Sequence, residues 1–390
     1  MKFFQKLMHK EGTKSVLSSV ISIIIGLMVG ALIVVIVGLA SSSIRGKDIW
    51  EGIRLVIFGI FSTGRNAANG LSFGFNPVNI GNLMFRSTRL IMTGLSVAIA
   101  FKTGLFNIGV AGQYVMGSFG ALIAVLYFKG NWVLGLFMAI LFGAIWGAIP
   151  GLLKAFCGVS EVISGIMLNW IALFFTNYSF QTYLSASCVD PKVGYKTYSV
   201  TYYNLHGKLP DLGLKGVLGY NFTIAIFIAI IVCIVIYIIL NKTTLGYQLK
   251  ASGLNKDATR YAGIADKRNL VLTMAIAGGI AGLGAGLFYL ADLESISVQL
   301  SSSLPGVPWN GIVVAFLSQL SPIGAIFASV FIAWISEGAK LMTQTIYPAE
   351  FGDLITGIIV YLSGLTAIIE HLLIAFKNRK KKTLKVEGEK

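Results

Sequence analysis

The sequence predicts an all-α membrane protein, a polytopic bundle of about ten transmembrane helices. Of its 390 residues, 55% are hydrophobic and only 12% are charged. The mean hydropathy is +0.78, and a soluble domain carries about twice that charged fraction. Hydrophobic runs recur at the length needed to cross a bilayer. The 45 glycines suit helices that pack closely in lipid.

The first hydrophobic run, residues 16–40, follows a lysine-rich tail. It is longer than the core of a signal peptide, so we expect it to be retained as a span. Further spans are expected at residues 90–110, 113–128, 132–152, 161–180, 221–240, 269–290, 309–320, 322–342 and 354–375, and two of the ten crossings are short or broken. The transmembrane domain is therefore expected over residues 16–375, between an N-terminal tail at 1–15 and a basic tail at 376–390.

The basic residues indicate the orientation of the chain. An even number of crossings places both termini on one side, and lysines and arginines gather in the tails and in the loop 241–268. Because loops rich in these residues stay inside, we expect cytoplasmic termini and a multi-pass protein of the cell membrane. The net charge of +15 then reflects orientation in the lipid bilayer, and we expect no nucleic-acid partner.

Two segments, 41–88 and 181–220, are expected outside the membrane. Neither is long enough to form an independent enzyme domain. The second contains several tyrosines, and three roles stay open for it: a cap over the transport pathway, a docking surface, or a connecting loop.

Small residues recur at every fourth position in two of the expected spans. The glycines concerned are Gly143, Gly147 and Gly151 in one span and Gly278, Gly282 and Gly286 in the other. Such stripes let helix backbones touch in lipid, where water does not drive association. We favour packing within one chain over a dimer contact.

Two glycine- or proline-interrupted stretches predict broken helices, Phe101–Gln113 and Leu317–Gly324. A break at membrane depth is tolerated only against protein or a water-filled cavity, so we place the first beside the translocation path. Gly94–Phe101 followed by Asn107–Gly109 can be laid over residues 311–318 followed by 322–324, with a gap of two residues. This weak similarity predicts an internally duplicated transporter.

The expected substrate pathway combines amide and hydroxyl groups with aromatic rings. Its residues are Phe101, Phe106, Asn107, Gly109, Gln113, Asn169, Trp170, Ser318 and Gln319. This inventory suits a neutral polar ligand with a flat ring, and we expect no arginine in mid-span to neutralise an anion. Each polar residue has the alternative of a helix-to-helix hydrogen bond, so both interpretations stay open.

The loop 241–268 contains the pattern of a short amphipathic helix. Asn255 can cap it and Gly263 can end it. Its apolar face consists of Leu254, Ala258, Tyr261 and Ala262, while Lys256 and Arg260 lie on another side. So short a helix needs a groove to be stable, either on its own bundle or on a partner.

Three separated motifs give the chain a resemblance to a known family. KTGLFNIGVAGQ at 102–113, GLLKAFCGVSEVISGIMLNW at 151–170 and LKASGLNKDATRYAGI at 249–264 resemble permease subunits of nucleoside ABC importers, within the branched-chain amino acid and ribose-type permease superfamily. The likeness covers roughly residues 90–375. Glu161 and Asn169 resemble a family motif, to which we assign a structural or gating role.

The resemblance implies three protein partners. They are a second homologous permease subunit, a cytoplasmic ABC ATPase that holds ATP and magnesium, and an external substrate-binding lipoprotein. It also implies that the segment from Leu254 to Gly263 is the coupling helix. The coupling residues are Gly253, Leu254, Asn255, Ala258, Arg260, Tyr261 and Gly263.

We expect a transport subunit without an ATPase site or bound cofactor of its own, because the chain has no G-x-x-x-x-G-K-[ST] phosphate loop. The alternatives are an ABC permease for a simple sugar such as ribose or galactose, an ion-gradient-driven secondary transporter, and a membrane enzyme. Glu161, Glu337 and Glu370 lie near span ends, which disfavours ion coupling. The histidines are dispersed and the three cysteines widely spaced, so we expect no metal site and no catalytic group.

Overall fold

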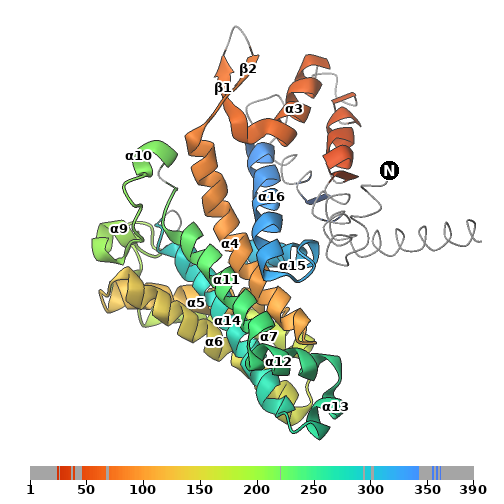
Figure 1. Cartoon of the computed structure of the whole chain (residues 1–390). Coiled ribbons are helices and arrows are strands. Elements are labelled where there is room, and N and C mark those ends of the chain that lie inside the picture. The colour runs from red at the N-terminus through yellow and green to blue at the C-terminus, as the bar shows by residue number, and fades with distance from the viewer. Residues whose placement is uncertain are drawn as a thin grey trace, which may run out of the picture. The chain divides into compact units, whose positions relative to one another are not determined.

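The computed structural model describes residues 24–25, 27–36, 38–39, 46–66, 70–219, 221–292, 295–299, 303–341, 354, 357–358 and 361. The chain forms two compact units. The larger comprises Asn76–Ala333, and the smaller comprises Met1–Phe75 with Trp334–Lys390. Figure 1 shows that the described elements are almost all helices.

In the smaller unit, a short hairpin follows a helix. Helix α3 (Gly46–Phe58) continues through the 3-10 turn η1 (Gly59–Phe61) into the antiparallel strands β1 (Ser62–Asn66) and β2 (Gly70–Phe73). The Trp334 indole N–H donates a hydrogen bond to the Ile57 carbonyl oxygen at 2.9 Å. This bond ties the end of α3 to the last turns of helix α16, which belong to the same unit.

The larger unit is a helical bundle. Its long helices are α4 (Pro77–Lys102), α5 (Val110–Leu122) with its π-helical continuation η2 (Ile123–Tyr127), α6 (Trp132–Cys157), α7 (Glu161–Thr182), α11 (Ala225–Lys242), α14 (Asp266–Tyr289), α15 (Val307–Leu317) and the part of α16 (Pro322–Lys340) that precedes Trp334. The shorter ones are α8 (Ser185–Cys188), α9 (Val200–Tyr203), η3 (Leu205–Gly207), α10 (Lys215–Leu218), α12 (Thr244–Leu254) and α13 (Lys256–Tyr261).

Among the described residues, 7 helices are long and apolar enough to cross a membrane. They are α4, α5 with η2, α6, α7, α11, α14 and α16, and each matches a predicted span. Helix α15 is the short crossing expected at 309–320. The expected first span is described in part, at Leu27–Ile36, and the span expected at 354–375 lies almost wholly outside the described residues. The prediction of a polytopic helical bundle is confirmed.

Helix α4 begins earlier than its hydropathy indicates. The Asn76 side-chain oxygen accepts hydrogen bonds from the backbone N–H groups of Val78 (3.1 Å) and Asn79 (3.3 Å), and Pro77 opens the first turn. Asparagines and arginines in the first half of α4 lower its hydropathy and displaced the predicted start to residue 90. Residues 77–88, expected in an external segment, are therefore helical.

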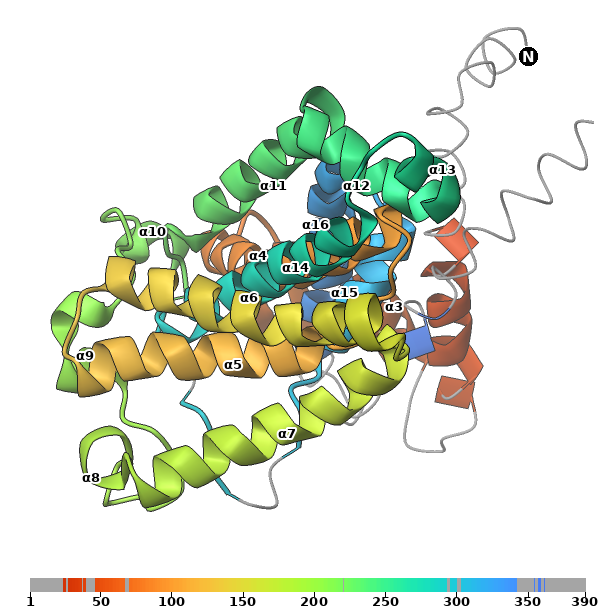
Figure 2. The same cartoon turned by 90° about the horizontal axis from the view of Figure 1, so that it is seen from below.

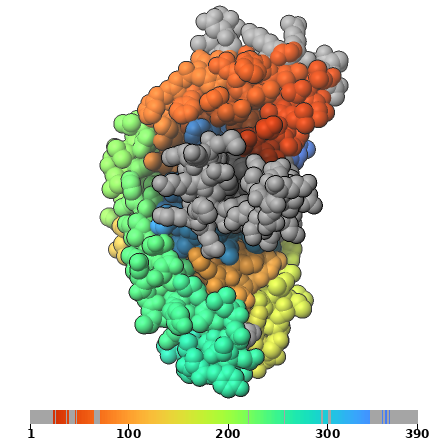
Figure 3. Space-filling model, turned by 45° about the vertical axis from the view of Figure 1, so that its right-hand side comes forward, coloured from red at the N-terminus to blue at the C-terminus, as the bar shows by residue number. Residues whose placement is uncertain are grey.

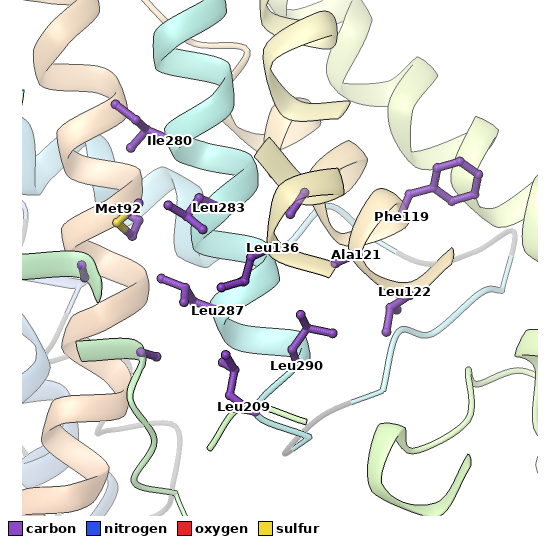
Figure 4. Packing of buried hydrophobic residues seen from close by; sticks show 14 of the residues in the cluster. Met92, Phe119, Ala121, Leu122, Leu136, Leu209, Ile280, Leu283, Leu287 and Leu290 are labelled. Carbon is purple, nitrogen blue, oxygen red and sulfur yellow. The ribbon is translucent and has the colours of Figure 1, made fainter. Parts of the chain in front are cut away.

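Helix α14 lies at the centre of the larger unit and packs against α4, α5 and α6. Figure 4 shows Leu283 and Leu287 of α14 between Met92 of α4 and Leu136 of α6. All four side chains are buried. Tight contacts of this kind hold helices together in lipid, where little apolar surface is removed from water.

The glycine stripes bring α6 and α14 into backbone contact. A Cβ atom on Gly278 would lie 2.3 Å from the Gly143 carbonyl oxygen, and a Cβ on Gly143 would lie 2.4 Å from the Gly278 carbonyl oxygen. Gly147 and Gly282 continue this contact along the two helices. The predicted packing within one chain is confirmed for these stripes.

The two predicted breaks share one backbone structure. In the first break, the Thr103 N–H donates to the Ile99 carbonyl and the Leu105 N–H donates to the Ala100 carbonyl, at 3.2 and 2.9 Å. In the second break, the matching bonds run from Ser318 to Val314 and from Leu320 to Ala315, at 2.9 and 2.8 Å. Gly104 and Gln319 have positive φ angles of 75° and 51° at equivalent positions.

These hydrogen bonds correct the register of the internal repeat. Residues 99–109 (IAFKTGLFNIG) and 314–324 (VAFLSQLSPIG) align without a gap. The predicted overlay of 94–101 on 311–318 was therefore out of register, whereas that of 107–109 on 322–324 was right. Phe101 and Phe316, which are equivalent in this alignment, contact each other with ring centroids 4.9 Å apart.

The bundle has two distinct ends. The short helices α9 and α10 lie at one end, and α12 and α13 lie at the other, in both Figure 1 and Figure 2. Figure 2 shows α8 at the same end as α9. Helix α14 runs from the second end to the first. Features at the two ends are therefore separated by the length of the bundle.

The contact between α6 and α14 generates a prediction with a neighbouring control. Gly278→Ala is expected to destabilise the protein by about 1–3 kcal/mol, because the added methyl group meets backbone that cannot give way. Gly279→Ala is the control, since its Cβ would meet neighbours at ordinary distances of 3.4–3.5 Å. Thermal unfolding of the purified protein in detergent compares them, and equal melting temperatures for the two variants would contradict the packing described.

Candidate functional site

A pair of buried amide side chains holds the first break, residues 103–109. Asn107 and Gln113 each donate a side-chain hydrogen bond to the other, at 2.8 and 2.9 Å. Asn107 also donates to the Ser96 hydroxyl of α4 (3.1 Å), which donates to the Ala277 carbonyl oxygen of α14 (2.7 Å). Asn107 and Gln113 are 0% and 1% exposed. The break is thus joined to α4 and α14 through a chain of hydrogen bonds.

Helix α7 supports the same break at two points. The Glu161 carboxylate accepts a hydrogen bond from the Phe106 backbone N–H at 3.4 Å and forms an ion pair with Lys154 of α6. Two turns further along α7, the Asn169 side-chain oxygen accepts from the Gly112 backbone N–H at 2.7 Å. Both contacts satisfy backbone groups that a broken helix leaves unpaired. This geometry fits the first of the two roles, structural or gating, that were expected for Glu161 and Asn169, and the choice between them stays a prediction.

The remaining expected pathway residues occupy three places. Phe101 and Phe106 contact each other beside the first break (4.8 Å between ring centroids), where Gly109 also lies. The Ser318 hydroxyl donates to the Ala315 carbonyl oxygen in the second break, which also contains Gln319. Trp170 is 47% exposed on α7 and stacks on Phe174. Their role in a substrate pathway stays a prediction.

A cavity of about 450 Å³ lies between α4, α5, α7 and α14. Its walls include Arg89, Tyr114, Ser118, Thr176, Asn177 and Tyr289, together with residues 296–297, 303 and 305–307. None of these was among the expected pathway residues. The sequence contains one indication of this cavity: Tyr114 and Ser118 are four residues apart, a spacing that places two polar groups on the same face of α5.

Arg89 brings a positive charge to the cavity wall. It lies in the middle of α4, and its guanidinium carbon is 4.1 Å from the Phe288 ring centroid and 5.3 Å from that of Phe85. The expectation that no arginine sits in mid-span was therefore wrong, because the start of α4 was misplaced. The supposed lack of a mid-span arginine can therefore no longer be used as an argument against an anionic cargo.

Hydrogen bonds hold the segment 295–299 between α7 and residues 195–197, which come after α7 in the chain. Asn177 of α7 donates a side-chain hydrogen bond to the Gln299 carbonyl at 2.9 Å. On the other side, the Val298 N–H donates to the Tyr195 carbonyl (2.9 Å) and the Thr197 N–H donates to the Ile296 carbonyl (3.1 Å). We call residues 183–219 the cap segment. These bonds place the cap segment beside the part of the cavity wall formed by residues 296–297, and the three roles left open for it stay predictions.

At the other end of the bundle, α12 and α13 form the expected helical segment. The Asn255 side-chain oxygen accepts hydrogen bonds from the backbone N–H groups of Asp257 and Ala258, both at 3.0 Å, and so caps α13. Gly263 ends this segment with a φ angle of 74°. The predicted cap and terminator are confirmed.

The apolar side of α13 faces outward. Tyr261 is 94% exposed and Ala258 is exposed as well. Leu254, which was expected on the same helix, is instead the last residue of α12, because the chain turns at Asn255, and it is 88% exposed beside them. Figure 3 shows this part of the chain, coloured green to teal, at the surface. Arg260 lies on another side, where a hydrogen bond and ion pair with the Asp266 carboxylate (3.0 Å) raise the pKa of its guanidinium above the ordinary value. Among the described residues, none forms a groove of the bundle in which this apolar face is buried.

A contact between two glycines joins this segment to the first break. A Cβ atom on Gly253 would lie 2.3 Å from the Thr103 carbonyl carbon and 2.6 Å from the Gly104 backbone nitrogen. Gly104 itself has a φ angle of 75°, which favours glycine. The end of α12 therefore rests directly on the backbone of the break, next to the residues that precede α13.

Comparison with known proteins identifies the family. A family model described as branched-chain amino acid transport system, permease component, matches residues 79–364. The chain belongs to this permease family. The matched range includes the breaks, the cavity and the α12–α13 segment of this permease. Together with the seven apolar helices found among the described residues, this match makes the chain a membrane protein and a transport component.

Individual relatives give more detail about this permease. It is 34% identical to the nucleoside ABC transporter permease protein NupB of Lactococcus lactis subsp. cremoris, over 82% of this chain and 93% of that protein. It is 31% identical to the guanosine ABC transporter permease protein NupP of Bacillus subtilis, over 89% and 96%. NupC, another nucleoside ABC transporter permease protein of the same Lactococcus, is 25% identical over 64% and 78%. Relatives of the permease therefore occur in pairs.

The amide pair at the break predicts strong coupling between its members. Asn107→Leu and Gln113→Leu are each expected to destabilise the protein by about 1–3 kcal/mol, because each leaves its partner buried without a hydrogen bond. The double variant should be less destabilised than the sum by at least about 1 kcal/mol. Denaturant unfolding in detergent measures this double-mutant cycle. The partly buried pair Asn82 and Asn221, joined at 2.6 Å, is the control and should couple less.

The contact between Gly253 and the first break predicts that a substitution distant from the cavity impairs transport. Gly253→Ala is expected to lower transport by at least about tenfold, because the methyl group forces α12 away from the break. Gly216→Ala is the control, since a Cβ there meets nothing within 4 Å. Uptake into proteoliposomes is the measurement. Equal uptake by the two variants, at equal protein levels, would show that the contact has no part in transport.

Proposed function

We propose that this permease is a transmembrane subunit of an ATP-driven ABC importer for nucleosides. The observation that carries the proposal is the exposed apolar face of α13, which joins the first break through Gly253 and Gly104. A surface of this kind is suited to receive force from a separate motor protein. The similarity to NupB and NupP supports nucleosides as the cargo.

The proposal includes an orientation in the cell membrane. Both termini and the loop 241–268 are cytoplasmic, which follows from the concentration of lysine and arginine in these regions. The cap segment then lies on the external side. The opposite positions of α13 and of α8 to α10 in the bundle support this assignment (Figure 2).

The proposed assembly has three further components. A second homologous permease is supported by the paired relatives NupB and NupC. A cytoplasmic ABC ATPase binds ATP and magnesium and docks on the apolar face of α13, since the permease has no phosphate loop of its own. An external substrate-binding lipoprotein delivers the nucleoside to the side of the cap segment.

The mechanism is alternating access driven by the ATPase. ATP binding draws the ATPase subunits together and moves α13 with them. The end of α12 follows, because Gly253 rests on Thr103 and Gly104. The break then shifts between two packings, and the bundle opens to one side of the membrane or to the other.

Reconstitution tests the energy source. Proteoliposomes that contain the permease pair, the ATPase and the binding lipoprotein should take up radiolabelled nucleoside only with ATP and magnesium inside. An ion gradient without ATP should give no uptake. Uptake driven by a proton or sodium gradient, by vesicles holding this chain alone, would overturn the proposal.

A charge on the apolar face of α13 is expected to prevent docking. Tyr261→Asp and Ala258→Asp should each abolish ATP-dependent uptake, because a carboxylate buried against an apolar groove has no compensating partner. The ATPase should also be lost from the purified complex. Tyr202→Asp, at an 80% exposed tyrosine of the cap segment, is the control and should retain the ATPase. Normal retention of the ATPase by both α13 variants would contradict the docking surface.

A further inference from the structure

The turn at residues 128–131 marks the level of the membrane surface. One membrane span ends at Tyr127 and the next begins at Trp132, so the residues between them lie where the chain leaves the lipid and re-enters it. Tyr127 and Phe128 are both exposed there, with ring centroids 5.1 Å apart. Tyrosine and tryptophan are enriched at such boundaries, because their rings suit the headgroup layer. Side chains that pack against this turn therefore lie at headgroup level.

Residues 200–207 of the cap segment, which form α9 and η3, are bound to this turn. The Asn204 side chain donates hydrogen bonds to the carbonyl oxygens of Val125 (3.0 Å) and Gly130 (2.7 Å). A Cβ atom on Gly207 would collide with the Val125 side chain, so η3 rests directly on the end of η2. Figures 1 and 2 both show α9 beside the ends of α5 and α6. Helices α9 and η3 therefore lie at the same depth as the ends of these two spans.

The side chains that this part of the chain turns outward are large and apolar. Tyr202 is 80% exposed, Leu205 is 68% exposed and Phe128 is 65% exposed. Leu134 of α6, which is also exposed, packs against Gly130 of the turn. The exposed apolar surface of the α6 span thus adjoins that of the turn, without a polar boundary at the end of the span.

A basic side chain beside these residues suits a phosphate headgroup. Lys129 is exposed in the turn, and its ammonium nitrogen is 5.7 Å from the Tyr203 ring centroid. A lysine at this depth can lay its stem along apolar surface and extend its charge to a phosphate. A bilayer offers apolar and phosphate layers at adjacent depths, and it already surrounds the spans on both sides of the turn. The lipid bilayer is therefore the occupant that this surface fits.

We propose that α9, η3 and the turn 128–131 form an interfacial anchor, with Tyr202, Leu205 and Phe128 in the headgroup layer of the bilayer. Residues 190–196 of the cap segment, which expose two lysines, stay in water. The cap segment thus divides into a part that faces lipid and a part that is free to meet a soluble protein. The proposal rests on the membrane location of the chain and needs no assumption about the cargo.

The interfacial anchor is joined to the end of α14. The Ser199 hydroxyl, just before α9, donates a hydrogen bond to the Asp292 carboxylate at 2.9 Å. Asp292 has a φ angle of 63°, a left-handed backbone conformation that turns the chain shortly after α14. This end of α14 is therefore held at a fixed depth in the membrane. A change of packing then moves the α12–α13 end of the helix instead.

Spin-label accessibility measures the depth of the anchor. Nitroxides attached through Tyr202→Cys and Leu205→Cys, in the whole permease in liposomes, should collide with dissolved oxygen rather than with a water-soluble nickel chelate. The ratio of the two collision rates should exceed that of a nitroxide attached through Lys192→Cys by at least about threefold. Equal ratios at the three positions would overturn the proposal.

A second probe separates lipid from a protein that covers the same surface. The labels are introduced with Cys157→Ser, because Cys157 is exposed whereas Cys188 and Cys233 are buried. In vesicles that contain a lipid with a nickel chelate on its headgroup, the labels at 202 and 205 should relax faster than the label at 192. Labels at 202 and 205 that neither oxygen nor nickel reaches would show a second copy of the chain on this surface, and would overturn the lipid assignment.

The complete importer tests whether the anchor matters for transport. Leu205→Glu places a charge in the headgroup layer and should lower ATP-driven uptake at least about threefold. Tyr202→Trp, which keeps an interfacial ring, and the water-facing Lys192→Glu should both retain uptake. All three should retain the ATPase, because the anchor lies at the opposite end of the bundle from α13. Wild-type uptake by Leu205→Glu would show that the anchor does not hold α14 during transport.

The measurements also separate this proposal from the proposed function. If the wild-type importer takes up no nucleoside with ATP, the proposed function fails, and the depth of the labels still decides the anchor. If uptake depends on ATP but the labels at 202 and 205 lie in water, the anchor fails and the proposed function stands.

Discussion

The first break can exist at membrane depth only because its backbone groups find partners inside the protein. Lipid offers no hydrogen bonds, so every interrupted turn must be satisfied by neighbouring side chains. Glu161 and Asn169 supply acceptors from α7. The Asn107 and Gln113 pair fills the space between α4, α5 and α14 with groups that satisfy each other. The positions of α4, α5 and α7 around the cavity depend on this arrangement.

The internal repeat shows which parts of a broken helix are general and which are specialised. Both copies end a helix with the same backbone hydrogen bonds, and both place a phenylalanine at the contact between the copies. Beyond that point they differ. The first copy continues with Phe106 and Asn107, whereas the second continues with Ser321 and Pro322. The buried amide network thus belongs to one copy alone, which is the copy that contacts α12.

Sequence patterns predicted those features that depend on neighbours in the chain. Asn255 and Gly263 bracket α13 within a few residues, and the glycines of the break stand beside polar groups in an apolar context. The start of α4 was misplaced, because Arg89 contacts Phe288 of α14 and Asn82 bonds Asn221 before α11, and a hydropathy window does not represent such distant partners. The cavity was missed for the same reason: Tyr114, Thr176 and Tyr289 come from three helices, and only the fold brings them together.

Helix α14 is fastened at both ends. Near its start, the Asn269 side chain donates to the Ser252 hydroxyl of α12 at 2.9 Å. Just beyond its end, the Asp292 carboxylate accepts hydrogen bonds from the backbone of Val200 and Thr201 at 2.6 and 3.0 Å. A helix anchored in this way links α12 to the cap segment, so any ligand whose binding at one end shifts α14 changes the affinity at the other end, and the two effects are equal in free energy.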